Sequence, residues 1–191
     1  MKIGLLGGSF DPVHNGHLAL ARAALAAGME RVWLIPAAQA PLKPAAVCAP
    51  AADRLAMLRL AAADCPGAEV CDIELRRGGI NYTIDTVRAL RAAHPDAELF
   101  WIIGADQLGR LDAWREIGAL TELVEFLCAV RPGYALAAPA GLPGLRWRRL
   151  ECPTWDVSLT EVRARLARGE SPAGLVPDKA IEYLERTRLY R

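Results

Sequence analysis

The chain of 191 residues predicts an α/β protein in which helices cover both faces of a doubly wound parallel sheet. Short apolar runs alternate along it with segments of helical periodicity, which is the pattern of repeated strand–helix units. Hydrophobic residues make up 53% of the sequence, which is ample for a buried core. Two long segments rich in proline or glycine, residues 37–50 and 133–145, each follow a predicted strand. Loops of such length are usually functional in compact domains, so we expect them to frame a binding crevice.

The predicted strands are short apolar segments that end at glycine, proline or another turn signal. We place them at residues 2–6, 31–36, 70–75, 99–103, 124–130 and 146–150. The predicted helices have apolar residues at helical spacing and stop signals, such as Gly28 after the first and Pro95 after the third. They occupy residues 15–27, 51–63, 83–93, 111–120, 159–168 and 178–187. We expect a single domain over residues 1–191, in which residues 158–191 form a small helical C-terminal part.

Composition excludes several classes of protein. The formal net charge is +1, so neither a nucleic acid nor a membrane surface is an expected partner. The five cysteines are odd in number and contain no CxxC pair, which argues against a zinc cluster or a disulfide framework. No signal peptide and no apolar run long enough to span a membrane is present. We therefore expect a cytoplasmic protein with reduced thiols; its oligomeric state stays open, a homo-oligomer included.

The most informative segment is GGSFDPVHNGHLAL, residues 7–20, which joins the first predicted strand to the first predicted helix. The chain has three histidines, and two of them, His14 and His17, are spaced so that they share one face of that helix. A helix N-terminus offers unpaired N–H groups and the positive end of the dipole, which suits a phosphate. Gly7 and Gly8 allow the backbone to approach such a group closely. We therefore predict a phosphate-binding turn.

Other interpretations of this segment remain open. His14 can be an N-cap-like residue and His17 a half-buried side chain with its hydrogen bonds satisfied. A zinc site is less favoured, since no cysteine or further histidine lies at ligand spacing. The glycines alone are weak evidence, because the sequence contains neither a GxGxxG dinucleotide motif nor a GxxxxGK phosphate loop.

Two segments resemble the signatures of one enzyme superfamily. Residues 8–17, GSFDPVHNGH, resemble the G-(S/T)-F-D-P-x-H-x-G-H signature of the HxGH nucleotidyltransferases. Residues 157–163, VSLTEVR, are similar to the second signature of that superfamily, ISSTxIR, with Leu159 in place of the usual serine. Two motifs in the right order at opposite ends of the chain make a chance match improbable.

Further segments narrow the resemblance to the bacterial nicotinate-nucleotide adenylyltransferases. Residues 36–43, PAAQAPLK, are similar to a PxxxPPHK loop, and residues 81–86, NYTIDT, to an SYTIDT segment. Residues 103–106, IGAD, together with Trp114 resemble a GxD…W stretch, and residues 131–133 resemble an RPG turn. The departures are Leu42 for histidine and Asn81 for serine. These two departures affect only those roles that the family gives to the loop histidine and to the serine hydroxyl.

The resemblance implies that ATP and nicotinate mononucleotide react to give deamido-NAD and pyrophosphate, a step of NAD biosynthesis. The second pKa of a phosphate monoester is about 6, so the attacking phosphate is mostly dianionic at neutral pH. The reaction therefore needs no general base. The enzyme's work is then positioning and neutralisation of phosphate charge. Mg²⁺ is the expected cofactor, ligated mostly by ATP and water, with no metal site on the protein.

The resemblance also implies roles for particular residues. His14, His17, Lys43 and Arg163 would act in catalysis, with His17 the strongest candidate for stabilising the transition state. The positions implied to bind ATP are Gly8, Ser9, Phe10, His14, His17, Gly104, Asp106, Ser158, Thr160 and Arg163. The positions implied to bind the mononucleotide are Lys43, Thr83, Trp114 and Arg131, with Thr83 at the nicotinate carboxylate and Trp114 on the pyridine ring.

Most of these residues also have a purely structural interpretation. Ser158 and Glu161 form a capping box, Asp106 can cap the next helix, Trp114 can belong to the core, and Lys43 can be a solvated loop lysine. At the level of function, the alternatives are an adenylyltransferase for nicotinamide mononucleotide or another phosphate such as phosphopantetheine. A nucleotide-binding sensor without turnover is the alternative outside enzymes.

Overall fold

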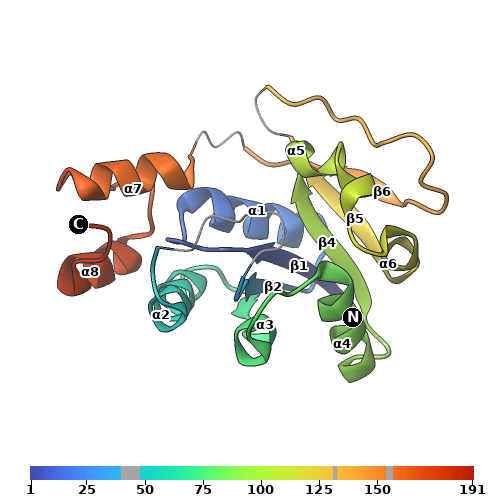
Figure 1. Ribbon diagram of the computed structural model, residues 1–191, viewed down its shortest axis with the longest axis horizontal. Helices are drawn as coiled ribbons and strands as arrows, with labels where there is room; N and C mark the ends of the chain where they lie inside the picture. The colour runs from blue at the N-terminus through green and yellow to red at the C-terminus, as the bar shows by residue number, and fades with distance from the viewer. Residues whose placement is uncertain (40–47, 131–132, 154–156) are drawn as a thin grey trace.

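A computed structural model describes residues 1–39, 48–130, 133–153 and 157–191 (Figure 1). It confirms the predicted α/β class, because six strands form one sheet in the order β3-β2-β1-β4-β5-β6 and every neighbouring pair is parallel. The strands are β1 (Lys2–Gly8), β2 (Arg31–Pro36), β3 (Ala68–Val70), β4 (Glu98–Gly104), β5 (Val124–Ala129) and β6 (Trp147–Leu150).

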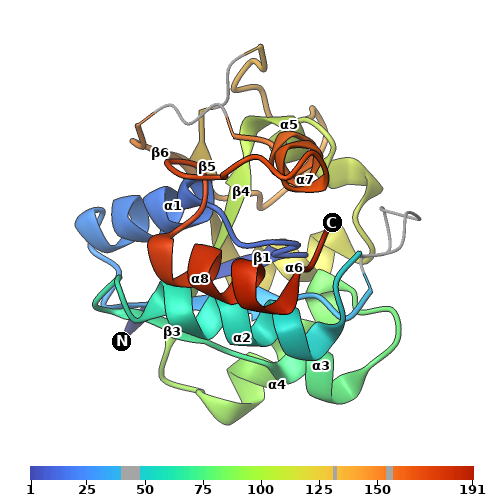
Figure 2. The ribbon, with the colours of Figure 1, turned by 90° about the vertical axis from the view of Figure 1, so that its left-hand side faces the viewer.

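Helices cover both faces of this sheet (Figure 1). They are α1 (Asn15–Ala26), α2 (Ala51–Ala62), α3 (Ile73–Arg77), α4 (Thr83–Ala93), α5 (Ala105–Leu108), α6 (Ile117–Leu123), α7 (Leu159–Ala167) and α8 (Asp178–Thr187), with a 3₁₀ turn η1 (Leu111–Ala113). Buried residues of α1, α2, α7 and α8 share one core cluster, and those of α4, α5 and α6 share the other. Helix α8 lies alongside α2, where Lys179 pairs with Asp64 at 2.6 Å (Figure 2).

The two clusters take alternate side chains of the same strands. Leu6 of β1 and Leu34 of β2 belong to the first cluster, whereas Leu5 of β1 and Trp101 of β4 belong to the second. A parallel sheet covered on both faces requires strands that are apolar throughout, which explains why these segments read as continuous apolar runs. None of the helices in the described ranges has the length and apolar character needed to cross a membrane.

The strand order places a topological switch point between β1 and β4. The chain moves outward from β1 to β2 and β3, then returns to β4 on the other side of β1 and continues to β5 and β6. Leu5 pairs with Trp101, and both strands extend three residues further, to Gly8 and Gly104. In such sheets ligands bind at the carboxyl ends of the strands at the switch point. The fold therefore points to the turns that follow Gly8 and Gly104.

The predicted strand over residues 70–75 is wrong except at Val70, because β3 covers residues 68–70. Strand β3 ends at Val70, and α3 begins at Ile73. Local contacts favour the helix, because the Asp72 carbonyl accepts the N–H of Arg76 and the Asp72 carboxylate pairs with the Arg76 guanidinium. At the edge of the sheet, β3 pairs over only three residues, so little ladder energy opposes that helix.

The predicted helix over residues 111–120 is divided into η1 and α6. Glu116 lies between them with a left-handed backbone, φ 51°, which cannot continue a helix. The side chain of Glu116 accepts a hydrogen bond of 2.8 Å from Arg88 of α4. This tertiary contact is the reason that we find for the break. The short helix α5 was also not predicted, since four residues carry no readable periodicity.

Candidate active site

The turn after β1 is held in a strained and buried conformation. Phe10 has a left-handed backbone, φ 46°, and its side chain is fully buried. A left-handed non-glycine residue costs about 1–2 kcal/mol, so the packing around Phe10 must impose it. The carbonyl of Gly8 accepts the N–H of Ala37 at 2.8 Å, which ties the turn to the end of β2. The backbone of residues 8–10 is therefore rigid where the sequence predicts phosphate contact.

Arg54 of α2 holds this turn through hydrogen bonds to backbone carbonyls. Its guanidinium Nη1 donates to the carbonyl of Ser9 at 2.6 Å and to the carbonyl of Ala37 at 2.9 Å. Only 1% of Arg54 is exposed, and this burial lowers the pKa of its guanidinium. Through these two hydrogen bonds Arg54 orients two backbone segments at the switch point. The sequence offered no signal for it, because an arginine in an amphipathic helix normally faces solvent.

The two histidines of the first motif stack on each other. His14 is the N-cap of α1, and its N–H donates to Nδ1 of His17 at 3.1 Å. The ring centroids are 3.6 Å apart with 25° between the planes, and the Phe10 ring lies 4.7 Å from that of His17. Because Nδ1 of His17 accepts, a neutral His17 carries its proton on Nε2, which makes Nε2 a donor. The predicted N-cap role of His14 and a phosphate contact are thus compatible.

The N-terminus of α1 offers fewer backbone donors than the sequence predicts. The N–H of Asn15 donates to the carbonyl of Leu175 at 2.7 Å, and the N–H of His17 donates to the carbonyl of His14 at 2.9 Å. The Asn15 side chain adds a bond of 2.9 Å to the carbonyl of Gly174. The segment before α8 therefore uses part of this helix terminus. The imidazoles, rather than the helix end alone, are the groups suited to meet an anion.

Asp11 joins the first motif to the second. Its carboxylate is 1% exposed, and Oδ2 lies 3.0 Å from Nη1 of Arg163 on α7. The same carboxylate accepts the N–H groups of Cys48 at 2.7 Å and Ala49 at 3.0 Å, and the hydroxyl of Tyr190 at 2.6 Å. The 31% exposed Arg163 side chain is therefore anchored beside the turn that bears the histidines.

The second motif begins with the predicted helix cap. Ser158 is the N-cap of α7, and its Oγ accepts the N–H of Glu161 at 3.1 Å. Thr160 lies exposed in the first turn of the same helix. The Ser158 half of the predicted capping box is confirmed, whereas the Glu161 carboxylate accepts from Arg165 at 2.9 Å. The cap fixes where α7 starts and hence the direction from which Arg163 reaches Asp11.

The end of β4 forms the other half of the switch point. Gly104 is the N-cap of α5, so Asp106 is not the cap that the structural interpretation would make it. A Cβ atom on Gly104 would lie 2.5 Å from Oδ1 of Asp106. The carboxylate therefore folds back over Gly104, and only glycine leaves room for that position.

This geometry makes Gly104→Ala a test of where Asp106 must point. The clash is with the end of a flexible side chain, so we expect the fold to survive while the Asp106 carboxylate moves. The resemblance assigns Asp106 to ATP, and losing one hydrogen bond to a charged group costs about 1.5 kcal/mol or more, so we expect the Kd for ATP to rise roughly tenfold by calorimetry. Gly118→Ala is the control, since an added Cβ there meets nothing within 4 Å. Unchanged ATP affinity in Gly104→Ala would remove Asp106 from the site.

The residues predicted to bind the mononucleotide come partly together. Thr83 is the first residue of α4, where a helix leaves its N–H groups without intrahelical partners. Trp114 is half-buried and packs edge-on against Phe126, with 6.3 Å between centroids, so it is not wholly a core residue. The next residue, Arg115, places its guanidinium 4.6 Å from the Tyr82 ring, beside Thr83 in sequence. Lys43 and Arg131 lie outside the described residues.

Asn81, where the resemblance has serine, has a structural role here. Its amide nitrogen donates to the carbonyls of Gly78 and Gly79 at 3.1 Å each, and its oxygen accepts from Arg77 at 3.1 Å. Both glycines have a left-handed backbone. The asparagine therefore closes the loop that leads to Thr83, using an amide where a serine would have only one donor.

Behind this loop lies a buried carboxylate with an unusual pKa. Glu74 is 6% exposed and accepts the hydroxyl of Thr86 at 2.8 Å. Burial raises its pKa from 4.5 to about 6, while the Thr86 hydrogen bond and Arg77 oppose that rise. A raised pKa means that the folded protein prefers the protonated form. The stability that this preference contributes is present below pH 4.5 and is lost as the pH rises through about 6.

We therefore expect Glu74→Gln to remove this pH dependence. The pKa difference corresponds to about 2 kcal/mol, and the glutamine oxygen can still accept the Thr86 hydroxyl. Urea unfolding at pH 4.5 and pH 7.5 should show the variant gaining about 2 kcal/mol relative to the wild type at the higher pH. A difference between the two proteins that does not change with pH would show that Glu74 titrates normally.

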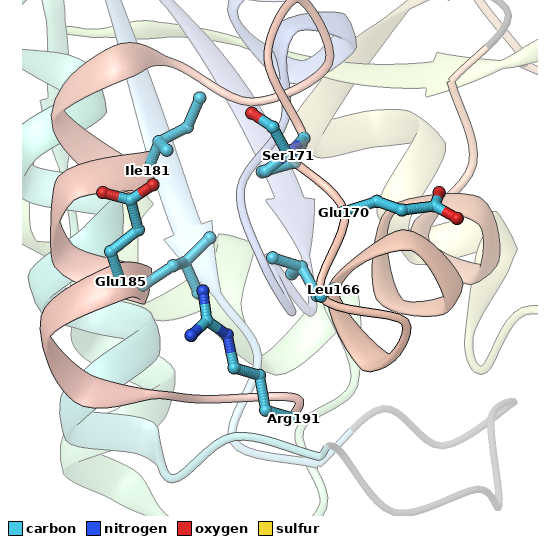
Figure 3. A pocket seen from close by; sticks show the side chains of 9 residues that line it. Leu166, Glu170, Ser171, Ile181, Glu185 and Arg191 are labelled. Carbon is cyan, nitrogen blue, oxygen red and sulfur yellow. The ribbon is translucent and has the colours of Figure 1, made fainter.

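A hollow lies between α7 and α8, and no residue of either motif lines it (Figure 3). Its lining residues are Leu166, Gly169, Glu170, Ser171, Pro172, Ile181, Leu184, Glu185 and Arg191. The charged side chains among these lining residues are Glu170, Glu185 and Arg191. None of the lining residues is one that the sequence analysis predicts to act in catalysis or binding. We therefore assign the chemistry to the switch point and not to this hollow.

The described residues contain no cluster of three His, Cys, Asp or Glu side chains suited to hold a metal ion. Asp11 already accepts four hydrogen bonds, so no lone pair of its carboxylate is left for a cation. All five cysteines are unpaired.

Comparisons with known proteins identify the family of the chain. Residues 5–165 match the model of the cytidylyltransferase-like family, so the chain is a nucleotidyltransferase of that family. The chain is 49% identical over 192 residues to the "Probable nicotinate-nucleotide adenylyltransferase" of Opitutus terrae, covering 100% of this chain and 98% of the relative. A relative of the same name from Bordetella petrii is 48% identical, with coverage of 100% and 99%. The chain belongs to the nicotinate-nucleotide adenylyltransferases, which confirms the predicted family.

A solved structure supports the fold independently of close sequence similarity. The "Plasmodium falciparum nicotinic acid mononucleotide adenylyltransferase complexed with NaAD" superposes with a TM-score of 0.82. The match covers 99% of this chain and 97% of that one at 17% identity. The same protein "complexed with APC" gives a TM-score of 0.80. At this identity the likeness establishes the architecture alone.

Proposed function

We propose that the protein transfers the adenylyl group of ATP to nicotinate mononucleotide, giving deamido-NAD and pyrophosphate in NAD biosynthesis. The observation that carries the proposal is the contact of the two motifs at the switch point. Arg163 meets Asp11 at 3.0 Å, in the turn that presents the stacked His14 and His17. The Arg163 guanidinium and the two imidazoles thus lie together at the place proposed for the triphosphate. The negative charge of Asp11 at this place is balanced by Arg163.

The reaction forms one bond and breaks one bond at the α-phosphorus of ATP. A phosphate oxygen of the mononucleotide attacks, and the bond to the bridging oxygen of the β-phosphate breaks, so that pyrophosphate leaves with the electron pair. His17 Nε2 and His14 donate to phosphate oxygens, and Arg163 neutralises the charge that builds on the leaving group. Ser158 and Thr160 lie at the α7 terminus for the β- and γ-phosphates, and Lys43 is assigned to the triphosphate by its motif. No residue needs to remove a proton.

Mg²⁺ fits this site as a companion of ATP. Since the Asp11 carboxylate is saturated with hydrogen bonds, phosphate oxygens and water would supply the ligands of Mg²⁺, and the ion would supply charge neutralisation on the leaving pyrophosphate. Gly104 and Asp106 then lie on the adenosine side of the switch point. Thr83, Trp114 and Arg131 are assigned to the mononucleotide, with the first turn of α4 facing the nicotinate carboxylate.

The test is pyrophosphate release by the purified protein with ATP and either nicotinate or nicotinamide mononucleotide. We expect a higher kcat/KM for the acid, because a helix N-terminus favours a carboxylate over a neutral amide. A preference for the amide would reject the substrate. Binding of ATP without turnover on either mononucleotide would instead indicate a sensor.

A further inference from the structure

The Asp11 carboxylate has a complete set of four hydrogen bonds from three parts of the chain. Oδ1 accepts the Ala49 N–H at 3.0 Å and the Tyr190 hydroxyl at 2.6 Å. Oδ2 accepts the Cys48 N–H at 2.7 Å and Nη1 of Arg163 at 3.0 Å. An ionised carboxylate accepts about four hydrogen bonds, so this one is saturated and its plane cannot rotate without losing a partner. The position of Arg163, which bonds Oδ2, thus depends on the two groups that bond Oδ1.

The segment after α8 is shaped to deliver the Tyr190 hydroxyl. Arg188 and Tyr190 both have left-handed backbones, with φ of 55° and 67°. This conformation is unfavourable for residues other than glycine, and the packing of Leu189 and Tyr190 against the first core cluster helps to offset its cost. The next residue, Arg191, lies with Leu166 of α7 and Glu185 of α8 around the hollow (Figure 3). The segment therefore returns between the two last helices instead of trailing into solvent.

The Tyr190 hydroxyl donates to Asp11 and holds its proton more firmly than an exposed tyrosine does. Burial and the bond to Asp11 raise the pKa of Tyr190, so its proton is retained. Because the Tyr190 hydroxyl keeps its proton, it donates steadily to Oδ1 of Asp11. Oδ2 then accepts the Cys48 N–H and Nη1 of Arg163.

We propose that Tyr190 and Asp11 are positioning residues for the triphosphate site. The Tyr190 hydroxyl fixes the Asp11 carboxylate, which in turn holds Nη1 of Arg163 and aims its remaining N–H groups at phosphate. Arginine can do both at once, because its planar group carries five N–H donors. The inference rests on the proposed adenylyl transfer, in which Arg163 binds the triphosphate. It adds to that function a residue that lies outside both motifs.

Tyr190→Phe tests the proposal, because it removes one hydroxyl and retains the ring that packs on the core. We expect kcat/KM for ATP to fall about tenfold, the size expected for one lost hydrogen bond to a charged group. The KM for nicotinate mononucleotide should not change. The Kd for ATP, measured by calorimetry without the mononucleotide, should rise by a similar factor.

The matched control is Tyr183→Phe. The Tyr183 hydroxyl also donates to an aspartate, Asp53, at 2.7 Å, and this bond joins α8 to α2 between two residues that belong to neither motif. We expect both kinetic constants and the Kd for ATP to match the wild type. All variants are compared at a temperature where their circular dichroism equals that of the wild type.

A double-mutant cycle separates positioning from general support of the fold. In an Arg163→Ala background, Tyr190→Phe should change the Kd for ATP less than about twofold, since the residue that it positions is gone. Equal losses in both backgrounds, no loss in either, or the same loss in Tyr183→Phe would each overturn the proposal. The titration with ATP decides this even if pyrophosphate release fails with nicotinate mononucleotide, which would reject the proposed function instead.

Discussion

His17→Ala should lower kcat by about a hundredfold or more while weakening ATP binding far less, because a transition-state donor is lost. His17 Nδ1 accepts the His14 N–H at 3.1 Å, so a neutral His17 carries on Nε2 the proton that the proposed reaction would donate to a phosphate oxygen. Charge on the leaving pyrophosphate rises as the bond breaks, so this hydrogen bond is stronger in the transition state than in the bound substrate. Steady-state kinetics together with ATP calorimetry measure the two effects.

Two further variants control for the structural role of His17. His17→Gln retains an acceptor at the third position of α1 and so retains the link to the N-cap. We expect it to restore the melting temperature but not kcat. His94→Ala removes the remaining histidine, which lies 4.9 Å from the Trp33 ring and away from both motifs, and it should leave kcat unchanged. Equal losses of kcat and ATP affinity in His17→Ala would mean that His17 binds substrate and transition state alike.

Arg54→Ala should lower the free energy of unfolding by about 3–5 kcal/mol, measured by urea titration. The substitution leaves the carbonyls of Ser9 and Ala37 without their donor and opens a cavity under the first turn. Because these carbonyls shape the turn that carries the histidines, we also expect turnover to be lost. Arg59→Ala, on the same helix, is the control. Its side chain is 62% exposed, and its loss should cost less than about 0.5 kcal/mol.

Arg54→Met separates the volume of Arg54 from its hydrogen bonds. Methionine fills much of the space and avoids burial of a charge, so we expect it to recover part of the lost stability. It cannot donate to Ser9 or Ala37, so turnover should remain at least about tenfold below the wild type. A Met variant with full activity would show that Arg54 only fills space and does not orient the turn.

Local sequence was enough to predict most of the elements and the centre of the site. The helices at 83–93 and 178–187 and the strand at 31–36 agree with the structure at both ends, because apolar periodicity and stop signals are local properties. The turn with His14 and His17 was readable because glycines, a proline and two histidines at fixed spacing are themselves the motif. The Ser158 cap was readable for the same reason, since its partner is three residues away.

The secondary-structure predictions that were wrong depended on contacts with residues distant in the chain. The break at Glu116 involves Arg88, and the helix over Ile73–Arg77 replaced a strand whose edge position the alternation could not reveal. The roles of Lys43 and Arg131, which lie outside the described residues, stay predictions.

The sequence by itself determined that this chain is a parallel α/β nucleotidyltransferase with a histidine-bearing turn after its first strand. Only the tertiary structure decided what holds that turn. Asp11 meets Arg163 across 152 residues and Tyr190 across 179, and Arg54 reaches Ser9 across 45. No periodicity encodes such contacts, because they arise when the sheet and the last two helices close around one buried carboxylate, and their free energy exists only once the whole core has packed.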